Sequence, residues 1–400
     1  MNKPEEQIKV FQEGAESLVS EDELLAKLRR GRPLRIKYGC DPSRPDLHLG
    51  HVVQLDHLRA LQDLGHTIIF LIGDFTARIG DPTGTSRTRP TLSKEDVRAN
   101  AETYREQVSR VLDVDRAEIR FNAEWMDRMS LDDFVRLCAR VTLARLMERD
   151  DFRGRYREGL PIALHELLYP MVQAYDSVAL QADVEVGGSD QHVNLLLARE
   201  IQRAFGQEPQ VALTFPLLEG VDGVEKMSKS VGNAIAITEP PDEMYGRTMS
   251  IPDEILPRWC DLLAQQDWAE VHRLRSGGAN PRDLKAALAR AITGRFWGEK
   301  DAIQAEERFD RLFRRHETPE EMPEIDVPSP GPEGSEVLDL LVRASFSSSR
   351  SEAKRLVAQG GVRLDGERVA GPDARVGPGE YVLQAGRRRF ARIRVRPSVG

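Results

Sequence analysis

Apolar and polar residues near the start of the chain follow patterns that predict a strand, a helix and a second strand. Residues 34–40, LRIKYGC, alternate as a strand does, and residues 48–64 place apolar side chains at helical spacing. Residues 67–74, TIIFLIGD, form a short apolar run of the kind found in strands that are buried on both faces. A strand, a helix and a strand at this spacing predict a parallel α/β unit.

The rest of the chain divides into helical and extended stretches. A helix-rich region runs from about residue 93 to residue 181, and residues 240–313 have helical periodicity almost throughout. Between them, residues 184–190 and 210–218 are predicted strands, each of which ends in a loop. The pattern therefore predicts an α/β domain with a parallel sheet and a helical insertion, followed by an α-helical region.

The end of the chain differs from the body in proline content and in charge. Residues 318–334, TPEEMPEIDVPSPGPEG, contain five prolines in 17 positions, which predicts a semi-rigid linker without a packed element. From residue 334 to residue 400 there are 13 Lys and Arg against 7 Asp and Glu, a net charge of +6. Because the whole chain has a net charge of -8, the remainder carries -14. A basic C-terminal region on an acidic body suits a nucleic-acid partner.

Composition narrows the class of protein further. A chain of 400 residues with 40% hydrophobic and 30% charged residues suits a globular protein of two or three domains. No apolar run approaches the roughly 18 residues of a membrane span, and the stretch MNKPEEQIKVFQEG does not resemble a signal peptide. Cys40, Cys138 and Cys260 are too few and too scattered for a disulfide framework or a Cys-rich zinc site. We therefore expect a cytoplasmic protein without a membrane partner.

The stretch Asp46-Leu-His-Leu-Gly-His51 directly follows the first predicted strand. His48 and His51 fall in the first turn of the following helix, where free N–H groups and the helix dipole favour an anion. Gly50 lets a phosphate or a flat ring approach the backbone closely. The pair could equally be structural, or could bind a metal, although no nearby Cys or His supplies a third ligand. From this stretch alone, all three interpretations stay open.

A second stretch with charged and hydroxyl side chains, Lys226-Met-Ser-Lys-Ser230, lies between Gly223 and Gly232. Such a loop should be mobile, so Lys226 and Lys229 could move onto a polyphosphate and leave with it. A solvated basic loop is the alternative.

A third stretch, LLYPMVQAYDSVAL, places Tyr169, Gln173 and Asp176 on one face of a helix, at i, i+4 and i+7. Pro170 should begin or kink this helix. An ordinary polar outer face is one interpretation of the spacing. The rest of the segment is too apolar for a plain surface helix, and polar groups within apolar walls are what an amino-acid pocket requires.

Taken together, HLGH and KMSKS, about 175 residues apart, closely resemble the two signatures of class I aminoacyl-tRNA synthetases. The pattern YxxxQxxD resembles the tyrosine-binding helix of the tyrosyl-tRNA synthetases, and Gly187-Gly-Ser-Asp-Gln191 resembles their GGSDQ loop. By itself, GGSDQ could be an ordinary turn at the end of a strand. The resemblance implies a Rossmann-like catalytic domain that activates L-tyrosine with ATP and transfers it to tRNA(Tyr).

The resemblance also implies roles for individual side chains. The catalytic residues, which would bind the ATP phosphates, are His48, His51, Lys226 and Lys229. The ATP-binding residues are Asp41, Gly50, Gly188, Asp190, Lys226, Ser228 and Lys229. The tyrosine-binding residues are Asp81, Tyr169, Gln173, Asp176 and Gln191. Of these, Tyr169, Gln173 and Asp81 would hold the ammonium group and Asp176 the phenol, although Asp81 in IGDPTG could simply form a turn. Mg²⁺ would arrive with ATP, and no dedicated metal site is expected.

The chain departs from the family pattern in the first strand. Many members have Tyr-Cys-Gly-Phe-Asp-Pro where this chain has Lys37-Tyr38-Gly-Cys-Asp-Pro, so Lys37 stands where a second phenol-binding tyrosine is expected. Tyr38 is displaced by one residue, which on a strand turns its side chain to the other face. We therefore expect that Asp176 carries more of the selectivity for tyrosine, or that another group helps it.

The C-terminal residues resemble an S4 RNA-binding domain. Residues 347–369 predict a basic helix, a Gly-Gly break and a hairpin that turns at Asp365-Gly366. Further on, arginines alternate with apolar residues up to Arg396, so that one strand face is all arginine. A solvated basic face is the alternative. The residues expected to bind RNA are Arg350, Lys354, Arg355, Arg392 and Arg394.

The resemblance implies four segments in order. Residues 1–238 would form the catalytic domain, with the helical insertion at about 110–182. Residues 239–317 would form a helical domain on the anticodon side, residues 318–334 the linker and residues 335–400 the S4-like domain. The family is usually homodimeric, through the helical insertion. Two other functions stay open: a tryptophanyl-tRNA synthetase, and a catalytically inactive RNA-binding relative.

Overall fold

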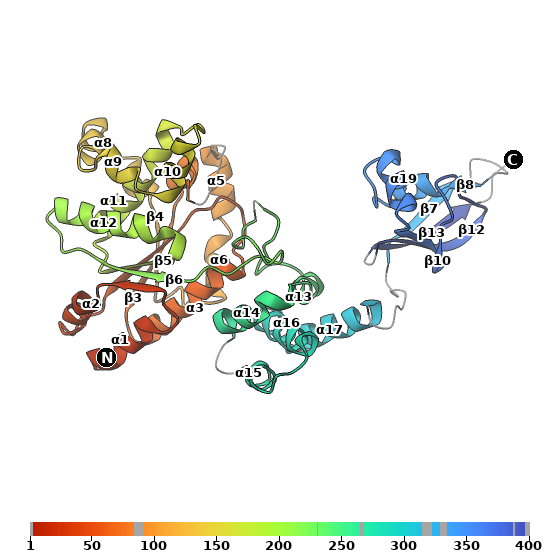
Figure 1. Cartoon of the computed structure of the whole chain (residues 1–400), viewed down its shortest axis with the longest axis horizontal. Coiled ribbons are helices and arrows are strands. Elements are labelled where there is room, and N and C mark those ends of the chain that lie inside the picture. The colour runs from red at the N-terminus through yellow and green to blue at the C-terminus, as the bar shows by residue number, and fades with distance from the viewer. Residues whose placement is uncertain are drawn as a thin grey trace. The chain divides into compact units, whose positions relative to one another are not determined.

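The chain folds into two compact units, Met1–Glu299 and Lys300–Gly400, which are described separately (Figure 1). The computed structural model describes residues 3–83, 92–229, 231–264, 268–313, 322–328, 334–386 and 389–396. Among these residues, no helix combines the length and the apolar character that crossing a membrane requires.

A six-stranded sheet of the described chain forms the centre of the first unit. Its spatial order is β1 (Ser17–Val19), β6 (Val211–Phe215), β5 (Val184–Gly188), β2 (Arg35–Cys40), β3 (Thr67–Ile72) and β4 (Glu118–Phe121). Only β1 runs antiparallel to its neighbour; the other pairs are parallel. The chain leaves β2 toward β3 on one side, while β5 lies on the other. The carboxyl ends of β2 and β5 therefore mark the switch point where ligands bind in open α/β sheets.

Helices cover both faces of this sheet (Figure 1). The helices nearest the ligand end are α3 (Leu49–Asp63) on one face and α11 (Tyr169–Leu180) with α12 (His192–Ala204) on the other. Strand β3 shows why both faces must be covered. Ile68 and Phe70 pack in the core that contains α3, whereas Ile69 and Leu71 pack against the α11 side. This double burial accounts for the continuous apolar run TIIFLI.

The strands and the first helix that the sequence predicted are present, with ends that differ by a few residues. Pro170 lies in the first turn of α11, where its missing N–H is not needed, so it begins this helix. Two strands of this sheet, β1 and β4, were missed. β4 lies inside the predicted insertion at about 110–182. It was missed because its sequence, EIRF, is short and half charged, as the sequence of an edge strand can be. The remaining short helices between β3 and α11 are α4 (Thr76–Ile79), α5 (Lys94–Ala101), α6 (Tyr104–Ser109), α7 (Ala123–Met126), α8 (Leu131–Cys138), α9 (Leu143–Leu146), α10 (Asp150–Arg157) and η1 (Leu164–Leu167).

The helical region after residue 239 belongs to the first unit and not to a domain of its own. Its helices are α13 (Pro241–Met249), η3 (Asp253–Ile255), α14 (Leu256–Leu263), α15 (Ala269–Ser276) and α16 (Pro281–Trp297). Met244, Trp259 and Ile292 pack in the same hydrophobic core as the central strands. Residues on both sides of the predicted boundary at 238 therefore contribute to one core, which helical periodicity alone does not show.

The second unit contains α17 (Glu299–Phe313, from Lys300 on), a five-stranded sheet and two short helices of the described chain, α18 (Val337–Arg343) and α19 (Arg350–Ala358). The sheet order is β10 (Glu367–Arg368), β9 (Val362–Leu364), β12 (Gly379–Ala385), β13 (Arg389–Arg396) and β7 (Glu324–Pro328). The predicted hairpin at Asp365-Gly366 is confirmed, since β9 and β10 pair antiparallel across it. β8 (Ser335–Glu336) and β11 (Arg375–Val376) form a separate pair.

Strand β7 corrects the prediction that residues 318–334 form no packed element. Residues 324–328 pair in parallel with β13, and Val327 is buried in the core of the second unit. An edge strand can end in a proline because one side of its backbone needs no partner. The rest of this proline-rich stretch lies mostly outside the described residues.

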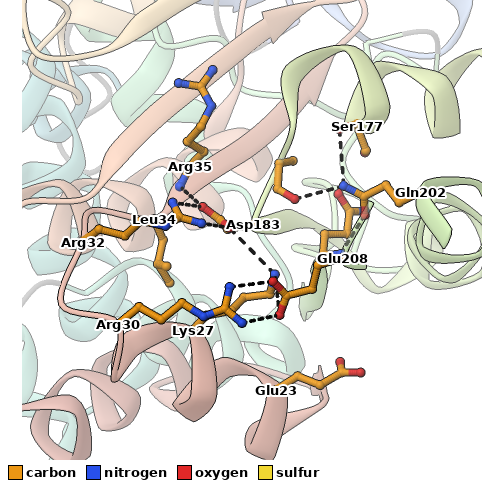
Figure 2. A network of polar contacts seen from close by, with 12 residues as sticks. Glu23, Lys27, Arg30, Arg32, Leu34, Arg35, Ser177, Asp183, Gln202 and Glu208 are labelled. Atoms are coloured by element: carbon orange, nitrogen blue, oxygen red, sulfur yellow. Dashed lines mark hydrogen bonds and ion pairs between the residues drawn. The ribbon is translucent and has the colours of Figure 1, made fainter. Parts of the chain in front are cut away.

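The amino ends of β2 and β5 are joined by a network of charged side chains (Figure 2). Asp183, just before β5, accepts hydrogen bonds from both terminal nitrogens of Arg32, at 2.9 and 2.7 Å. It also accepts the backbone N–H of Arg35 at 3.0 Å. The buried Lys27, from α2 (Glu21–Leu28), lies 3.8 Å from Asp183 and 3.6 Å from Glu208. The network lies at the amino ends of these strands, opposite the switch point at their carboxyl ends.

Candidate active site

The segments that follow the carboxyl ends of β2, β3 and β5 enclose a cavity together with α11 and the loop around residue 227. All but one of the residues that the sequence predicted for ATP and tyrosine line it. They are Asp41, His48, Gly50, His51, Asp81, Tyr169, Gln173, Asp176, Gly188, Asp190, Gln191, Lys226 and Ser228. The exception is Lys229, which lies beside Asp46. Segments far apart in the sequence thus meet where the fold predicts a ligand.

The two histidines sit at the start of α3 with their rings packed together, 3.9 Å between centroids. The backbone N–H of His48 donates to Nδ1 of His51 at 3.2 Å, so the neutral His51 ring carries its proton on Nε2. Burial and the charge of Lys229 lower the pKa of His51 to about 4, and burial keeps the pKa of His48 well below its usual value. Both rings are therefore neutral hydrogen-bond donors at pH 7.

Gly50 leaves room for the ring of His48. A Cβ at this position would lie 3.0 Å from two atoms of the His48 ring.

Among the described residues, no group of three or more His, Cys, Asp and Glu side chains could hold a metal ion.

The loop that carries KMSKS lies against the start of α3. Leu49 N–H donates to the carbonyl of Ile235 at 3.0 Å, and His48 pairs with Ala236 in an isolated antiparallel bridge. These backbone contacts place the two signature stretches side by side. The N–H of Ser228 donates to Oδ1 of Asn233 at 2.7 Å, which further orders the loop.

Both lysines of this loop are paired with carboxylates. Nζ of Lys226 lies 2.5 Å from Oδ2 of Asp190, and Nζ of Lys229 lies 2.8 Å from Oδ2 of Asp46. Gly188 makes room for the first pair, because a Cβ there would lie 2.7 Å from Oδ1 of Asp190. The two cations are thus held beside the cavity by ion pairs that a phosphate can replace.

Asp41 lines the cavity and contacts Tyr169 and Thr76. Its Oδ2 accepts the hydroxyl of Tyr169 at 2.9 Å, and its Oδ1 accepts the hydroxyl of Thr76 at 2.6 Å. Burial raises the pKa of Asp41 to about 7, against these two hydrogen bonds. A Cβ at Gly73 would lie 2.0 Å from Oδ1 of Asp41, so this glycine is needed for the arrangement. The contacts place Asp41, predicted with the ATP-binding residues, beside the predicted tyrosine-binding residues.

Two of the predicted ammonium-binding residues, Asp81 and Gln173, belong to one chain of hydrogen bonds. Gln191 donates to Oδ2 of Asp81 at 3.0 Å, and Asn194 donates to both Gln191 and Gln173 at 2.9 Å. Asp81 also accepts the backbone N–H of Thr83 at 2.9 Å, so it forms a turn as well. Asn194, in the first turn of α12, was not predicted.

Asp176 is buried at the end of the cavity and held by two donors. Nε1 of Trp125 donates to its Oδ1 at 2.8 Å, and Nδ2 of Asn122 donates to its Oδ2 at 3.2 Å. Burial raises the pKa of Asp176 to about 7, while Lys37, Trp125 and Asn122 act in the opposite direction. Sequence reasoning missed Asn122 and Trp125. The available signal was a tryptophan in the stretch that follows β4.

Lys37 and Tyr38 point to opposite faces of β2, as predicted. Tyr38 packs on Phe70, with 5.9 Å between ring centroids, on the face that α3 covers. Lys37 points toward α11 and is completely buried. Its Nζ lies 2.9 Å from a carboxylate oxygen of Glu185.

The predicted RNA-binding residues lie in the second unit. Lys354 and Arg355 are exposed on α19, whereas Arg350 is paired with Glu336 and Asp339. The arginines of β13 also alternate as expected, but their face is not all positive, because Arg392 pairs with Glu324, Arg394 with Glu380 and Arg396 with Asp326. The partner carboxylates come from neighbouring strands, whose register the sequence alone did not reveal.

Comparison with known proteins agrees with the geometry of the cavity. Residues 29–314 match the family described as tRNA synthetases class I (W and Y). The chain belongs to this family. Residues 337–382 match the S4 domain, so the class I synthetase unit is followed by an S4 domain.

Close relatives and solved structures extend this match. A tyrosine-tRNA ligase from Thermotoga maritima is 51% identical over 395 residues, which cover 98% of each chain. Tyrosine-tRNA ligase 2 from Vibrio parahaemolyticus is 50% identical over 96% of this chain and 97% of its own. The tyrosyl-tRNA synthetase of Archaeoglobus fulgidus, solved with L-tyrosine, superposes with a TM-score of 0.62 at 25% identity and covers 76% of this chain and all of its own. The truncated mitochondrial enzyme of Aspergillus nidulans has the same fold, with a TM-score of 0.63 at 22% identity over 78% of this chain and 95% of its own.

Proposed function

We propose that this chain is a tyrosine-tRNA ligase, which activates L-tyrosine with ATP and transfers the tyrosyl group to the 3′ end of tRNA(Tyr). The observation that carries the assignment is Asp176, a buried carboxylate at the end of the amino-acid cavity. Trp125 and Asn122 each donate to one of its oxygens, and the phenol of tyrosine would supply a further donor. Relatives about 50% identical over nearly the whole chain bear the same name.

Activation needs no nucleophile from the protein. A carboxylate oxygen of tyrosine attacks the α-phosphorus of ATP, the bond to the bridging oxygen breaks, and pyrophosphate leaves with both electrons of that bond. Catalysis then rests on positioning and on charge stabilisation. The neutral rings of His48 and His51 donate hydrogen bonds to phosphate oxygens, more strongly as negative charge builds up. The amino end of α3 adds its N–H groups.

The two loop lysines act on the leaving group. Lys226 exchanges Asp190 for a phosphate, and Lys229 exchanges Asp46 in the same way. Release of Lys226 also frees the carboxylate of Asp190 to accept hydrogen bonds from the ribose. Mg²⁺ bound to ATP would supply further neutralisation of the phosphate charge, and we assign it no protein residues of its own. A cytoplasmic location stays a prediction.

Selection of tyrosine follows from the contacts at the two ends of the cavity. Tyr169, Gln173 and Asp81 bind the ammonium group, and Asp176 accepts the phenol hydrogen. Phenylalanine would leave the Asp176 carboxylate buried without its partner, which costs more than a lost apolar contact. A tryptophan-specific enzyme of the same family is the second candidate, because the matched family includes both amino acids.

The test is pyrophosphate exchange into ATP, run with each of the twenty amino acids and without tRNA. Exchange with tyrosine alone is the expected result. Exchange with tryptophan would replace the proposed substrate. The absence of exchange with every amino acid would favour an RNA-binding protein without catalysis.

The apolar surface of the helical insertion supports a homodimer. Leu131 on α8, Leu143 on α9 and Leu164 on η1 are 79%, 60% and 76% exposed. These three residues belong to one insertion, and exposed apolar patches mark interaction surfaces. Leu131→Glu with Leu164→Glu should convert a dimer into a monomer in analytical ultracentrifugation. The matched control is Val224→Glu, an equally exposed apolar position outside the insertion, which should leave the dimer intact.

A further inference from the structure

Two opposite charges lie side by side in the middle of the central sheet. Lys37 on β2 and Glu185 on β5 are register partners on neighbouring parallel strands, and both point toward α11. Their side chains are 0% and 2% exposed. Replacing a buried ion pair with apolar residues is often neutral or stabilising. Stability alone therefore does not account for this pair.

Every donor of the Lys37 ammonium group is engaged. Its Nζ donates to Glu185 at 2.9 Å, to the hydroxyl of Ser177 at 2.9 Å and to the carbonyl of Gln173 at 3.0 Å. Glu185 in turn accepts Ser177 at 3.1 Å, Gln173 at 3.4 Å and Gln210. With three N–H groups bound to three protein acceptors, Lys37 has no donor left for a phenol. It cannot act as a direct substitute for a tyrosine hydroxyl.

The contacts of Lys37 fall on one turn of α11. Gln173 and Ser177 are separated by four residues, and Asp176 lies in the turn between them. The carbonyl and the hydroxyl that Lys37 binds therefore fix the backbone that presents the Asp176 carboxylate. Lys37, Glu185 and Asp176 all line the same cavity.

We propose that Lys37 and Glu185 form a positioning pair for amino-acid selection, which fixes the α11 turn of Asp176 and sets the charge around its carboxylate. The inference rests on the proposed tyrosine-ligase function. It explains how the chain could select tyrosine by its phenol, although Lys37 stands in place of the second tyrosine expected from the family pattern. Lys37 binds the turn of α11 that carries Asp176, and Glu185 offsets part of the positive charge of Lys37.

The groups that face Asp176 determine the sign of each effect. The charged ones are Lys37 from β2, Glu185 from β5 and Asp41 at the end of β2; Trp125 and Asn122 are neutral donors. Lys37 lowers the pKa of Asp176 and Glu185 raises it. The phenol hydrogen bond is strongest to the ionised carboxylate, so tyrosine use should increase as pH rises through about 7.

The experiment compares Lys37→Met, Glu185→Gln and the double variant. For each, kcat/KM for tyrosine and for phenylalanine is measured by pyrophosphate exchange from pH 5.5 to 8.5, with the KM for ATP as an internal control. In the plot of kcat/KM for tyrosine against pH, Lys37→Met should move the rising limb to higher pH. The kcat/KM at pH 7 should then fall by up to about tenfold for each pH unit that the limb moves. Glu185→Gln should move the limb to lower pH. The double variant should lie between them, near the wild type, and all three should keep the KM for ATP.

Opposite displacements of the limb are the decisive readout, because a purely structural role would reduce activity in both single variants without moving either limb. Unmoved limbs, or unchanged selectivity for tyrosine over phenylalanine, would overturn the inference. If Lys37→Met does not fold, Glu185→Gln and the double variant still decide, since the limb must move in the first and return in the second. Wild-type exchange with tryptophan, or with no amino acid, would instead count against the proposed function itself.

Discussion

The two ends of strands β2 and β5 carry buried charges in different states of balance. At the amino ends, Lys27, Arg30 and Arg32 surround two carboxylates, Asp183 and Glu208, and each carboxylate is bound by at least two cations (Figure 2). Burial lowers the pKa of Lys27, and both carboxylates oppose that change. Each of these five charged side chains therefore already has a partner of opposite charge within the protein.

Toward the carboxyl ends the balance is reversed. Lys37 pairs with Glu185 and lowers the pKa of Asp176, yet burial raises the pKa of Asp41 and of Asp176 to about 7. Negative charge without a full set of partners is costly in a protein interior. Under the proposed function, substrate groups supply those partners: an ammonium group near Tyr169, and a phenol hydrogen at Asp176. The difference indicates that one end of the strands maintains the fold, while the other is kept incomplete for binding.

The largest expected effect comes from breaking the balanced end. Asp183→Asn keeps the shape of the side chain but leaves Lys27 and Arg32 without their carboxylate, so the free energy of unfolding should fall by about 3 kcal/mol. Urea unfolding followed by tryptophan fluorescence measures it, because all four tryptophans lie in the first unit. The kcat/KM for tyrosine should change by less than about threefold, because Asp183 lies at the amino ends of the strands and the cavity lies at their carboxyl ends. A large loss of activity in the folded variant would contradict the division of roles.

The next effect is on binding at the incomplete end. Asp176→Ala removes the proposed acceptor of the phenol hydrogen, and a hydrogen bond to a charged group contributes about 1.5–3 kcal/mol. The kcat/KM for tyrosine should therefore fall about 10- to 150-fold, with the KM for ATP unchanged. Phenylalanine, which has no phenol, is the matched control. Equal losses for the two amino acids would contradict the proposed role of Asp176.

Much of this contrast was accessible from sequence, but only where the signal is local. The run TIIFLI and the alternation before Cys40 predicted central strands, and HLGH, KMSKS and YxxxQxxD predicted residues that now line one cavity. Each of these signals lies within a few residues. Their meeting point followed from the rule that ligands bind at the carboxyl ends of parallel strands.

The contacts that sequence reasoning missed depend on strand register and on packing. Lys37 and Glu185 are 148 residues apart, and nothing short of the β2–β5 register reveals that they are neighbours. A lysine and a glutamate in otherwise apolar strands do signal that each needs a buried partner, without naming it. Trp125 was missed with β4, whose charged sequence hides the strand that positions it. β7 was missed because prolines outweighed the alternation of Ile325 and Val327.

A smaller effect tests whether the incomplete end weakens the fold. The pKa of Asp176 is raised from 3.8 to about 7, so the folded chain holds a proton that the unfolded chain releases, and stability falls as pH rises between these values. Asp176→Asn removes this cost, and should raise the free energy of unfolding at pH 8 more than at pH 4. Urea unfolding at both pH values measures the difference. The same Asp-to-Asn change would then stabilise at one end and destabilise at the other, and a loss of stability at pH 8 would contradict the contrast.

The smallest effect separates buried from exposed members within the balanced end. Arg30 and Glu208 form a two-point ion pair, with hydrogen bonds of 2.6 and 2.8 Å, yet their side chains are 45% and 44% exposed. Water screens such a pair and already solvates both ions, so close geometry adds little. Arg30→Gln should change the urea midpoint by less than about a fifth of the change caused by Asp183→Asn. A comparable change in the two variants would mean that the network acts as one cooperative unit, in which the exposed pair holds Glu208 in place for the buried Lys27.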